Sequence, residues 1–158
     1  VVDEGAQIYR SAQPDEESFP ELKRVGIRSV LNLRQGFKDS VKYKEAFDGI
    51  REYECGVNAG MMKQADLVWA LKIIKEAPRP LLIHCLHGSD RTGTVVAAYR
   101  IVFQGWTPEQ AVTEMEHPRY GMHKFFYPNL STLIKRADWA KIRQEVLGSS
   151  QTQEKTGK

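Results

Sequence analysis

The stretch "PLLIHCLHGSDRTGTVVAAYR", residues 80–100, joins three patterns that together decide the fold. The short continuous apolar run at 80–84 is typical of a strand that is buried on both faces. Residues 91–105 are apolar on most sides, which predicts a helix packed in the centre of the molecule, with Gly105 as its C-cap. A buried strand, a polar loop and a central helix in this order indicate an α/β fold. In such folds the loop lies at the carboxyl edge of the sheet, where ligands bind.

The rest of the chain supplies further strand and helix patterns. Strands are predicted over 27–34 and 50–57, and helices over 65–78, 107–115 and 128–147. Asp66 is the expected N-cap of the first of these helices, and Pro78 its stop. Thr107 and Gln110 form a capping box around Pro108. We therefore expect one α/β domain over 1–147 with an at least partly parallel sheet, followed by a polar, disordered tail over 148–158.

The composition restricts the class of protein. The 158 residues are 41% hydrophobic and 27% charged with a formal charge of +3, which is typical of a globular domain. This charge is too small and too dispersed to indicate nucleic-acid binding, and no apolar run approaches the roughly 20 residues that span a bilayer. Two cysteines form neither a disulfide framework nor a zinc site. We expect a monomer without metal or cofactor.

The cellular compartment stays open. Because the chain begins with Val1 rather than Met, we expect that a preceding segment has been removed. An exported, periplasmic protein and a cytoplasmic protein are both compatible with this beginning.

The polar loop has the residues of an anion site around a nucleophile. Cys85 and Arg91 are separated by five residues, and a loop of this length can curl so that its N–H groups face an anion. The N-terminus of the following helix adds a positive dipole end, and Gly88 suits a position of positive φ. Arg91 can grip two phosphate oxygens at once. The same surroundings stabilise a thiolate at Cys85, and Thr92 can donate a hydrogen bond to that sulfur as it leaves.

The motif "HCLHGSDRTG" at 84–93 resembles the signature of the cysteine-dependent protein tyrosine phosphatase superfamily. "YRSAQP" at 9–14 and the segment 22–34 are similar to the opening of the small bacterial, plant and fungal dual-specificity-like phosphatases and of the phosphatase-like phytases. Residues 95–115 are similar to the two helices that follow the signature. The resemblance implies a central, mostly parallel sheet of four or five strands flanked by helices. It also implies metal-free hydrolysis of phosphomonoesters through a phosphocysteine on Cys85.

The resemblance also implies a general acid, and here the sequence departs from the pattern. The family needs an Asp roughly 25–30 residues before the cysteine, and the best match is Asn58. Three explanations remain: an engineered Asp→Asn change that traps substrate, Asp90 as the acid, or feeble activity. Asp90 is equally compatible with a structural role in which its carboxylate binds loop N–H groups. Asp66, the other acidic residue of the segment after Asn58, is interpreted as a helix cap.

The substrate is predicted from the small size and the "YRSAQP" opening, which resemble the inositol-phosphate and phytase-like branch at least as well as the protein branch, and from the cations that could surround the pocket. Those cations are Arg10, Arg34, Lys38, Lys63, Arg119, His123 and Lys124, each of which is also compatible with ordinary solvated surface. Arg34 and Lys38 are favoured because they follow a strand at the ligand-binding edge. The expected phosphate and substrate contacts are Leu86, His87, Gly88, Ser89, Asp90, Arg91, Arg34, Lys38, His123 and Lys124. We expect an inositol polyphosphate such as phytate as the substrate, with phosphotyrosine or dual-specificity protein substrates as the alternative.

Two other function classes remain. A phosphate-binding pseudophosphatase is compatible with Asn58. A rhodanese-like sulfurtransferase also uses a loop cysteine, but the Asp-Arg-Thr-Gly ending at 90–93 argues against it. Cys55 is expected to be an inert strand thiol, although a reversible disulfide that protects Cys85 is the other interpretation.

Overall fold

The computed structural model describes residues 1–148, and within them lies a four-stranded sheet in the order β1-β4-β2-β3. The strands are β1 (Ile8–Ser11), β2 (Ser29–Asn32), β3 (Arg51–Glu54) and β4 (Leu81–His84). Every neighbouring pair is parallel, which confirms the predicted α/β class and the mostly parallel sheet. The sequence patterns did not predict β1, because Ile8 is its only fully buried residue and four residues show little periodicity.

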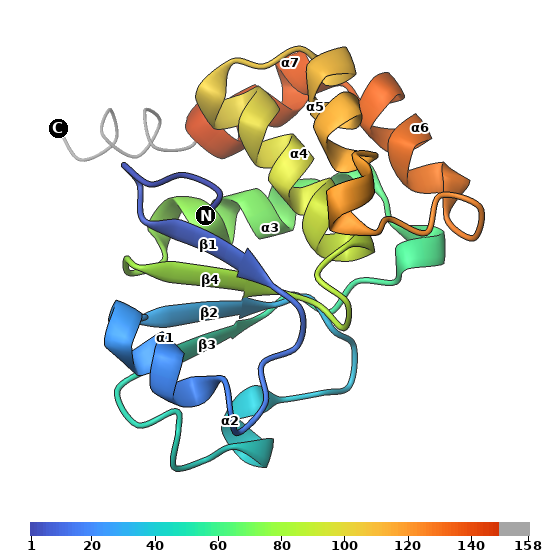
Figure 1. The fold of residues 1–158 in the computed structure, drawn as a ribbon. Helices are drawn as coiled ribbons and strands as arrows, with labels where there is room; N and C mark the ends of the chain where they lie inside the picture. Colours follow the sequence, from blue (N-terminus) through green and yellow to red (C-terminus); the bar gives the residue numbers. More distant parts are fainter. Residues whose placement is uncertain (149–158) are drawn as a thin grey trace, which may run out of the picture.

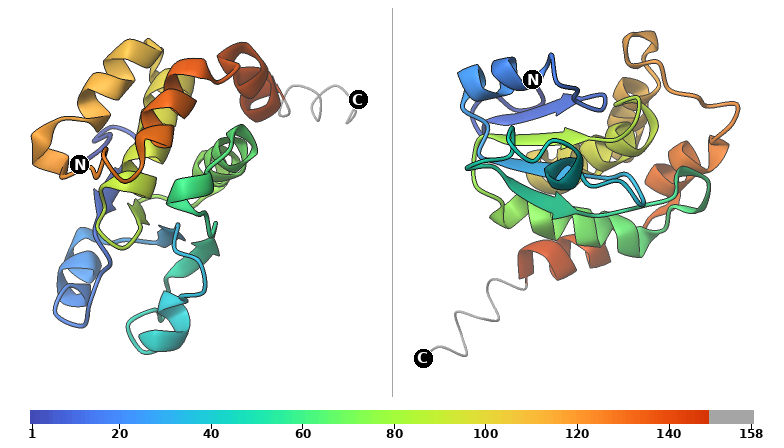
Figure 2. Two further views of the ribbon diagram at one scale, coloured as in Figure 1. Left: turned by 90° about the vertical axis from the view of Figure 1, so that its right-hand side faces the viewer. Right: turned by 90° about the horizontal axis from the view of Figure 1, so that it is seen from below.

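Helices cover both faces of the sheet (Figure 1). One face carries α3 (Gln64–Glu76), α4 (Asp90–Gln104), α5 (Pro108–Met115), α6 (Pro128–Arg136) and α7 (Trp139–Arg143). The other carries α1 (Phe19–Val25) and α2 (Asp39–Lys42), as the turned views of Figure 2 also show. Short 3₁₀ turns η1 (Ala59–Met61) and η2 (Pro118–Tyr120) and a π-helical turn η3 (Gln144–Gly148) complete the described chain. None of the helices within residues 1–148 is long and apolar enough to cross a membrane.

The central strand β4 is buried on both faces, as its apolar run predicts. Leu81 and Ile83 belong to the large core beneath α3 and α4. Leu82 belongs to a smaller core on the opposite face, where it packs with Phe19 and Val30. Each fully buried aliphatic side chain stabilises the fold by about 1.5–3 kcal/mol. These contacts hold the end of β4, and the loop that follows it, in a fixed position.

The helix predicted to pack in the centre of the molecule is confirmed. α4 runs from Asp90 to Gln104 and ends at Gly105, whose φ of 72° is the left-handed conformation of a glycine C-cap. The capping box at the start of α5 is also confirmed, because Thr107 and Gln110 bond each other's main-chain N–H groups at 3.2 and 2.9 Å.

Two helix boundaries differ from the prediction. α3 begins at Gln64, so Asp66 is not the N-cap; it lies in the first turn and accepts a hydrogen bond from the Lys63 N–H at 2.8 Å. The region 128–147 is not one helix. Ala137 is extended, and Asp138 caps a new helix by accepting from Lys141 N at 3.1 Å, because a short acidic side chain competes for main-chain N–H groups. The predicted disordered tail lies outside the described residues except for Gly148, which ends η3.

Candidate active site

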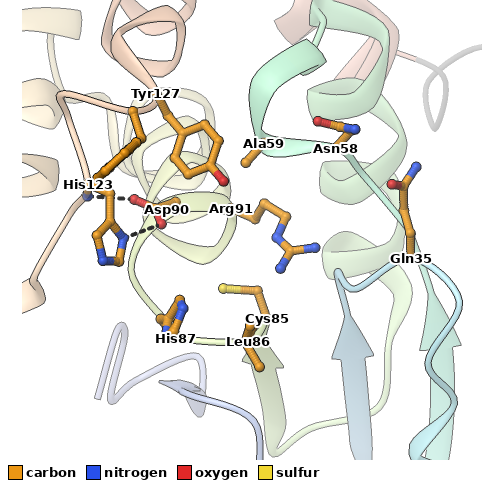
Figure 3. Close-up of a pocket in the computed structure, with 11 residues that line it drawn as sticks. Gln35, Asn58, Ala59, Cys85, Leu86, His87, Asp90, Arg91, His123 and Tyr127 are labelled. Atoms are coloured by element: carbon orange, nitrogen blue, oxygen red, sulfur yellow. Dashed lines mark hydrogen bonds and ion pairs between the residues drawn. The ribbon is translucent and has the colours of Figure 1, made fainter.

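The loops that follow β2, β3 and β4 meet at the carboxyl edge of the sheet. They bring Gln35, Asn58 and Cys85 to one pocket with a volume of about 380 Å³. Its wall consists of Gln35, Asn58, Ala59, Cys85, Leu86, His87, Asp90, Arg91, His123, Phe126 and Tyr127 (Figure 3). The predicted nucleophile therefore lies in a pocket at the edge where parallel sheets bind ligands.

The loop of residues 85–91, here named the Cys85 loop, curls around its own sulfur. The side chain of Cys85 is buried at the base of the pocket, and Gly88 N donates to its Sγ at 3.2 Å. Gly88 has the predicted positive φ, +72°, and a Cβ there would lie 2.6 Å from the main chain of Ser11 and Ala12. The guanidinium of Arg10 also donates to the Gly88 carbonyl at 2.7 Å. The loop is therefore clamped against the end of β1, and Arg10 supports it from outside rather than lining the pocket.

Arg91 lies in the first turn of α4 and directs its guanidinium into the pocket beside Cys85 (Figure 3). Its Nη1 donates to the Val57 carbonyl at 3.4 Å, which is long for a hydrogen bond. Thr92 differs from the prediction, because it makes no hydrogen bond to the sulfur. Its hydroxyl is buried and has no hydrogen-bond partner within residues 1–148.

Asp90 and His123 form a pair on one wall of the pocket. Asp90 Oδ1 accepts from the His123 main-chain N at 2.8 Å, and Oδ2 lies 2.7 Å from His123 Nδ1. Both carboxylate oxygens are thus occupied by the loop of residues 121–127. This contact matches the structural interpretation of Asp90 rather than a free carboxylic acid.

Asn58 lies across the pocket from this pair (Figure 3). Its Oδ1 accepts from Gly60 N at 2.9 Å and so caps η1. An amide in this position has no proton that it can release at neutral pH.

Most of the predicted cations do not face the pocket. Arg34 donates to Gln13 Oε1 at 3.0 Å and stacks on Phe37. Lys38 forms an ion pair with Glu54 at 3.3 Å. Lys63, Arg119 and Lys124 do not line the pocket either. Of the predicted cations outside the Cys85 loop, it is His123 that lines the pocket. Sequence reasoning missed Gln35, Ala59, Phe126 and Tyr127, whose residue types carry no signal of a pocket.

A buried ion pair lies beneath the Cys85 loop. His84 Nε2 contacts Asp39 Oδ2, and both side chains are fully buried. His84 Nδ1 lies 3.1 Å from the Cys85 carbonyl, so both ring nitrogens face oxygen atoms. Burial alone would raise the pKa of Asp39. The hydrogen bond and charge of His84, with a bond from Gln13, outweigh this and hold the pKa below its ordinary value of 3.8.

This pair predicts a large stability effect. Asp39→Ala leaves the buried His84 without its carboxylate and is expected to lower the free energy of unfolding by about 3–5 kcal/mol. Urea unfolding measures the loss, and Asp48→Ala, an exposed aspartate nearby, is the control expected to change it by about 0.5 kcal/mol or less. Because the folded pKa of Asp39 is depressed, its contribution is present above 3.8 and is lost as the pH falls further. Equal stability of Asp39→Ala and wild type at pH 7 would contradict the prediction.

The second cysteine, Cys55, is far less suited than Cys85 to act as a nucleophile. Cys55 is fully buried, and burial, with the charge of Asp66, raises the pKa of its thiol to about 12. Both cysteines are free thiols. Within residues 1–148, no group of three or more His, Cys, Asp or Glu side chains is arranged to hold a metal ion.

Comparisons with known proteins point to one family. A model described as "Tyrosine phosphatase family" matches residues 1–127. The chain is 34% identical over 116 residues to the dual specificity protein phosphatase TpbA of Pseudomonas aeruginosa, which covers 72% of this chain and 52% of TpbA. It is 32% identical over 124 residues to the inositol diphosphatase DSP3 of Arabidopsis thaliana, covering 73% of this chain and 59% of DSP3. The chain thus spans about half the length of the curated relatives it matches.

Solved structures agree with these matches. The crystal structure of P. aeruginosa TpbA superimposes with a TM-score of 0.80 at 29% identity, over 90% of this chain and 87% of that one. TpbA has also been crystallised in complex with phosphotyrosine. The catalytic core of Siw14 superimposes with a TM-score of 0.76 at 25% identity, over 91% of this chain and 88% of that one.

Proposed function

Since the chain belongs to the tyrosine phosphatase family, we propose that it is a cysteine-based phosphomonoesterase acting on aryl phosphates, with phosphotyrosine in proteins as the substrate class. The observation that carries this proposal is the pocket itself. Cys85 lies at its base, Arg91 enters from one side, and the aromatic side chains of Phe126 and Tyr127 belong to its lining.

The reaction proceeds in two displacements at phosphorus. The Cys85 thiolate forms a bond to phosphorus while the bond to the leaving oxygen breaks. Water then attacks the phosphocysteine, which releases inorganic phosphate and restores the thiolate. Throughout, the planar guanidinium of Arg91 holds two phosphate oxygens, and the N-terminus of α4 adds its positive dipole end.

The lining of the pocket favours an aryl ester over a polyphosphate. Leu86, Phe126 and Tyr127 line the pocket, and these apolar surfaces suit a flat ring. The neutral amides of Gln35 and Asn58 occupy the other side. No lysine lines the pocket within the described part of the chain, whereas several phosphates on one substrate call for several cations.

An inositol polyphosphate remains the second candidate substrate. It is supported by the similarity to DSP3, whose name is that of an inositol diphosphatase. It receives less support from the fold, because Arg34 and Lys38 are engaged by other partners away from the pocket.

A phosphate-binding protein without turnover is the other candidate function. Asn58 favours it, because an amide cannot supply the proton that the leaving oxygen needs. Such a protein would bind phosphate or vanadate in the pocket and release no phosphate from any ester.

The experiment that tests the proposal is a phosphate-release panel with a phosphotyrosine peptide, a phosphoserine peptide and inositol hexakisphosphate. We expect kcat/KM to be about tenfold or more higher for the phosphotyrosine peptide, since each 1.4 kcal/mol of ring contact gives a factor of ten. The reverse ranking would favour the inositol polyphosphate, and no release from any member would favour the inert phosphate-binding protein.

Two neighbouring phenylalanines provide a matched pair of variants. Phe126 lines the pocket, whereas Phe125 does not and is 91% exposed. We expect Phe126→Ala to lower kcat/KM for the phosphotyrosine peptide and Phe125→Ala to leave it unchanged. Equal values for both variants would argue against an aryl subsite beside Phe126.

A further inference from the structure

The proposed reaction needs a proton at the leaving oxygen, and the residue expected to supply it is an amide. Asn58 has its Oδ1 bonded to Gly60 N, and its NH₂ group holds no proton acidic enough to transfer. A proton donor must therefore come from another wall of the pocket, if the chain provides one.

The opposite wall holds a histidine that is oriented by a carboxylate. His123 is fixed to Asp90 through its main-chain N at 2.8 Å and its Nδ1 at 2.7 Å, as the dashed lines in Figure 3 show. The Asp90 side chain is 8% exposed, whereas that of His123 is 42% exposed and lines the same pocket as Cys85. The ring of His87 lies 5.3 Å from that of His123, centroid to centroid.

This geometry decides which ring nitrogen exchanges a proton. A carboxylate only accepts hydrogen bonds, so Nδ1 of His123 carries a hydrogen that points to Asp90. The other nitrogen, Nε2, is then the one that gains and loses the second proton. An imidazole nitrogen can give up and take back a proton, which the amide of Asn58 cannot do.

We infer that His123 is the general acid and base of this site, replacing the acid that Asn58 cannot be; the inference rests on the proposed phosphatase function. In the first displacement the protonated His123 gives its Nε2 proton to the leaving oxygen as that oxygen separates from phosphorus. In the second, neutral His123 takes a proton from the water that attacks the phosphocysteine. The sulfur leaves as thiolate, and His123 is again protonated.

Asp90 acts in this scheme as a positioning residue. Both of its oxygens are occupied by His123, so it orients the ring and stabilises the proton on Nδ1 rather than reaching substrate itself. Tyr127 is the competing donor, because Figure 3 shows its hydroxyl directed into the pocket toward Arg91.

The test compares two substrates that differ in their need for a proton. Phenyl phosphate releases a phenol of pKa about 10 and needs protonation, whereas 2,4-dinitrophenyl phosphate releases a far more acidic phenol and does not. The parameter is kcat/KM, which reports the step that forms the phosphocysteine. For His123→Asn we expect a loss of about 10²-fold on phenyl phosphate and less than about fivefold on the dinitrophenyl ester.

A matched control is His117→Ala, which removes a histidine from the same segment but outside the pocket. It is expected to match wild type on both substrates. An equal loss on both esters in His123→Asn, or no loss on phenyl phosphate, overturns the inference. So does a selective loss in Tyr127→Phe with His123→Asn unaffected, because the phenol would then be the donor.

Failure of the inference is distinguishable from failure of the proposed function. If wild type hydrolyses both esters and His123→Asn shows no selective loss, the phosphatase function is supported and the proposed role of His123 is contradicted. If wild type hydrolyses neither ester, the proposed function is contradicted, and so is the role of His123 that rests on it.

Discussion

Replacing Cys85 with serine is expected to reduce phosphate release by about 10⁴-fold or more, the largest effect of any single change in this protein. Serine keeps the size and position of the side chain at the base of the pocket, but its hydroxyl is a much weaker nucleophile than a thiolate. The Cys85 loop is retained, because Gly88 and Arg10 fix its main chain independently of the sulfur. We therefore expect the variant to bind phosphotyrosine peptide while failing to hydrolyse it.

The control for this variant is Cys55→Ala. Cys55 is fully buried, and burial raises the pKa of its thiol to about 12, so little thiolate exists there at neutral pH. Phosphate release should match wild type in this control. Mass spectrometry after brief iodoacetamide treatment should find the adduct on Cys85. Turnover by Cys85→Ser within tenfold of wild type would contradict a phosphocysteine mechanism.

Changing Arg91 to lysine is expected to lower kcat by about 10³-fold, because an arginine that clamps a transferring phosphoryl group contributes on this scale. Lysine keeps the charge but offers a point-like ammonium, whereas the guanidinium presents two parallel N–H groups to two oxygens. The effect should appear in the rate and also in weaker inhibition by vanadate, an oxyanion that Arg91 is expected to hold in the Cys85 loop as it holds phosphate.

Arg24→Lys is the matched control, since its side chain is 74% exposed on α1, away from the pocket. It should leave both kcat and vanadate inhibition unchanged. Circular dichroism of each variant separates a lost contact from a lost fold. Equal kcat for wild type and Arg91→Lys would mean that Arg91 contributes only its charge.

The elements that could be predicted are those specified by nearby residues. β4 and α4 follow from a five-residue apolar run and a capping glycine, and the start of α5 follows from Thr107 and Gln110. β1 could not be found this way, because it becomes a strand only by pairing with β4, from Ile8 with Leu81 to Ser11 with His84. Likewise, the break at Ala137 depends on competition for main-chain N–H groups that an apolar stripe does not show.

The residues of the candidate site also fall into those specified by nearby residues and those that depend on distant partners. Cys85 and Arg91 could be predicted as a pair because a single short loop holds both. The direction of a long cationic side chain could not be predicted. Arg34 bonds to Gln13 and Lys38 pairs with Glu54, because the fold brings these partners close to them. The sequence-based preference for a polyphosphate substrate depended partly on those directions and partly on the resemblance of the "YRSAQP" opening to the inositol-phosphate branch of the family.

By itself, then, the sequence determined the position of Cys85, of Arg91 and of the loop that joins them, because all three lie within one strand-loop-helix unit with local capping and turn signals. Only the tertiary structure decided the partners of these groups. His84 meets Asp39 across 45 residues, and Asp90 meets His123 across 33. Such contacts form when a parallel sheet and its covering helices bring distant loops to one edge, and no local pattern records which side chains will then face each other.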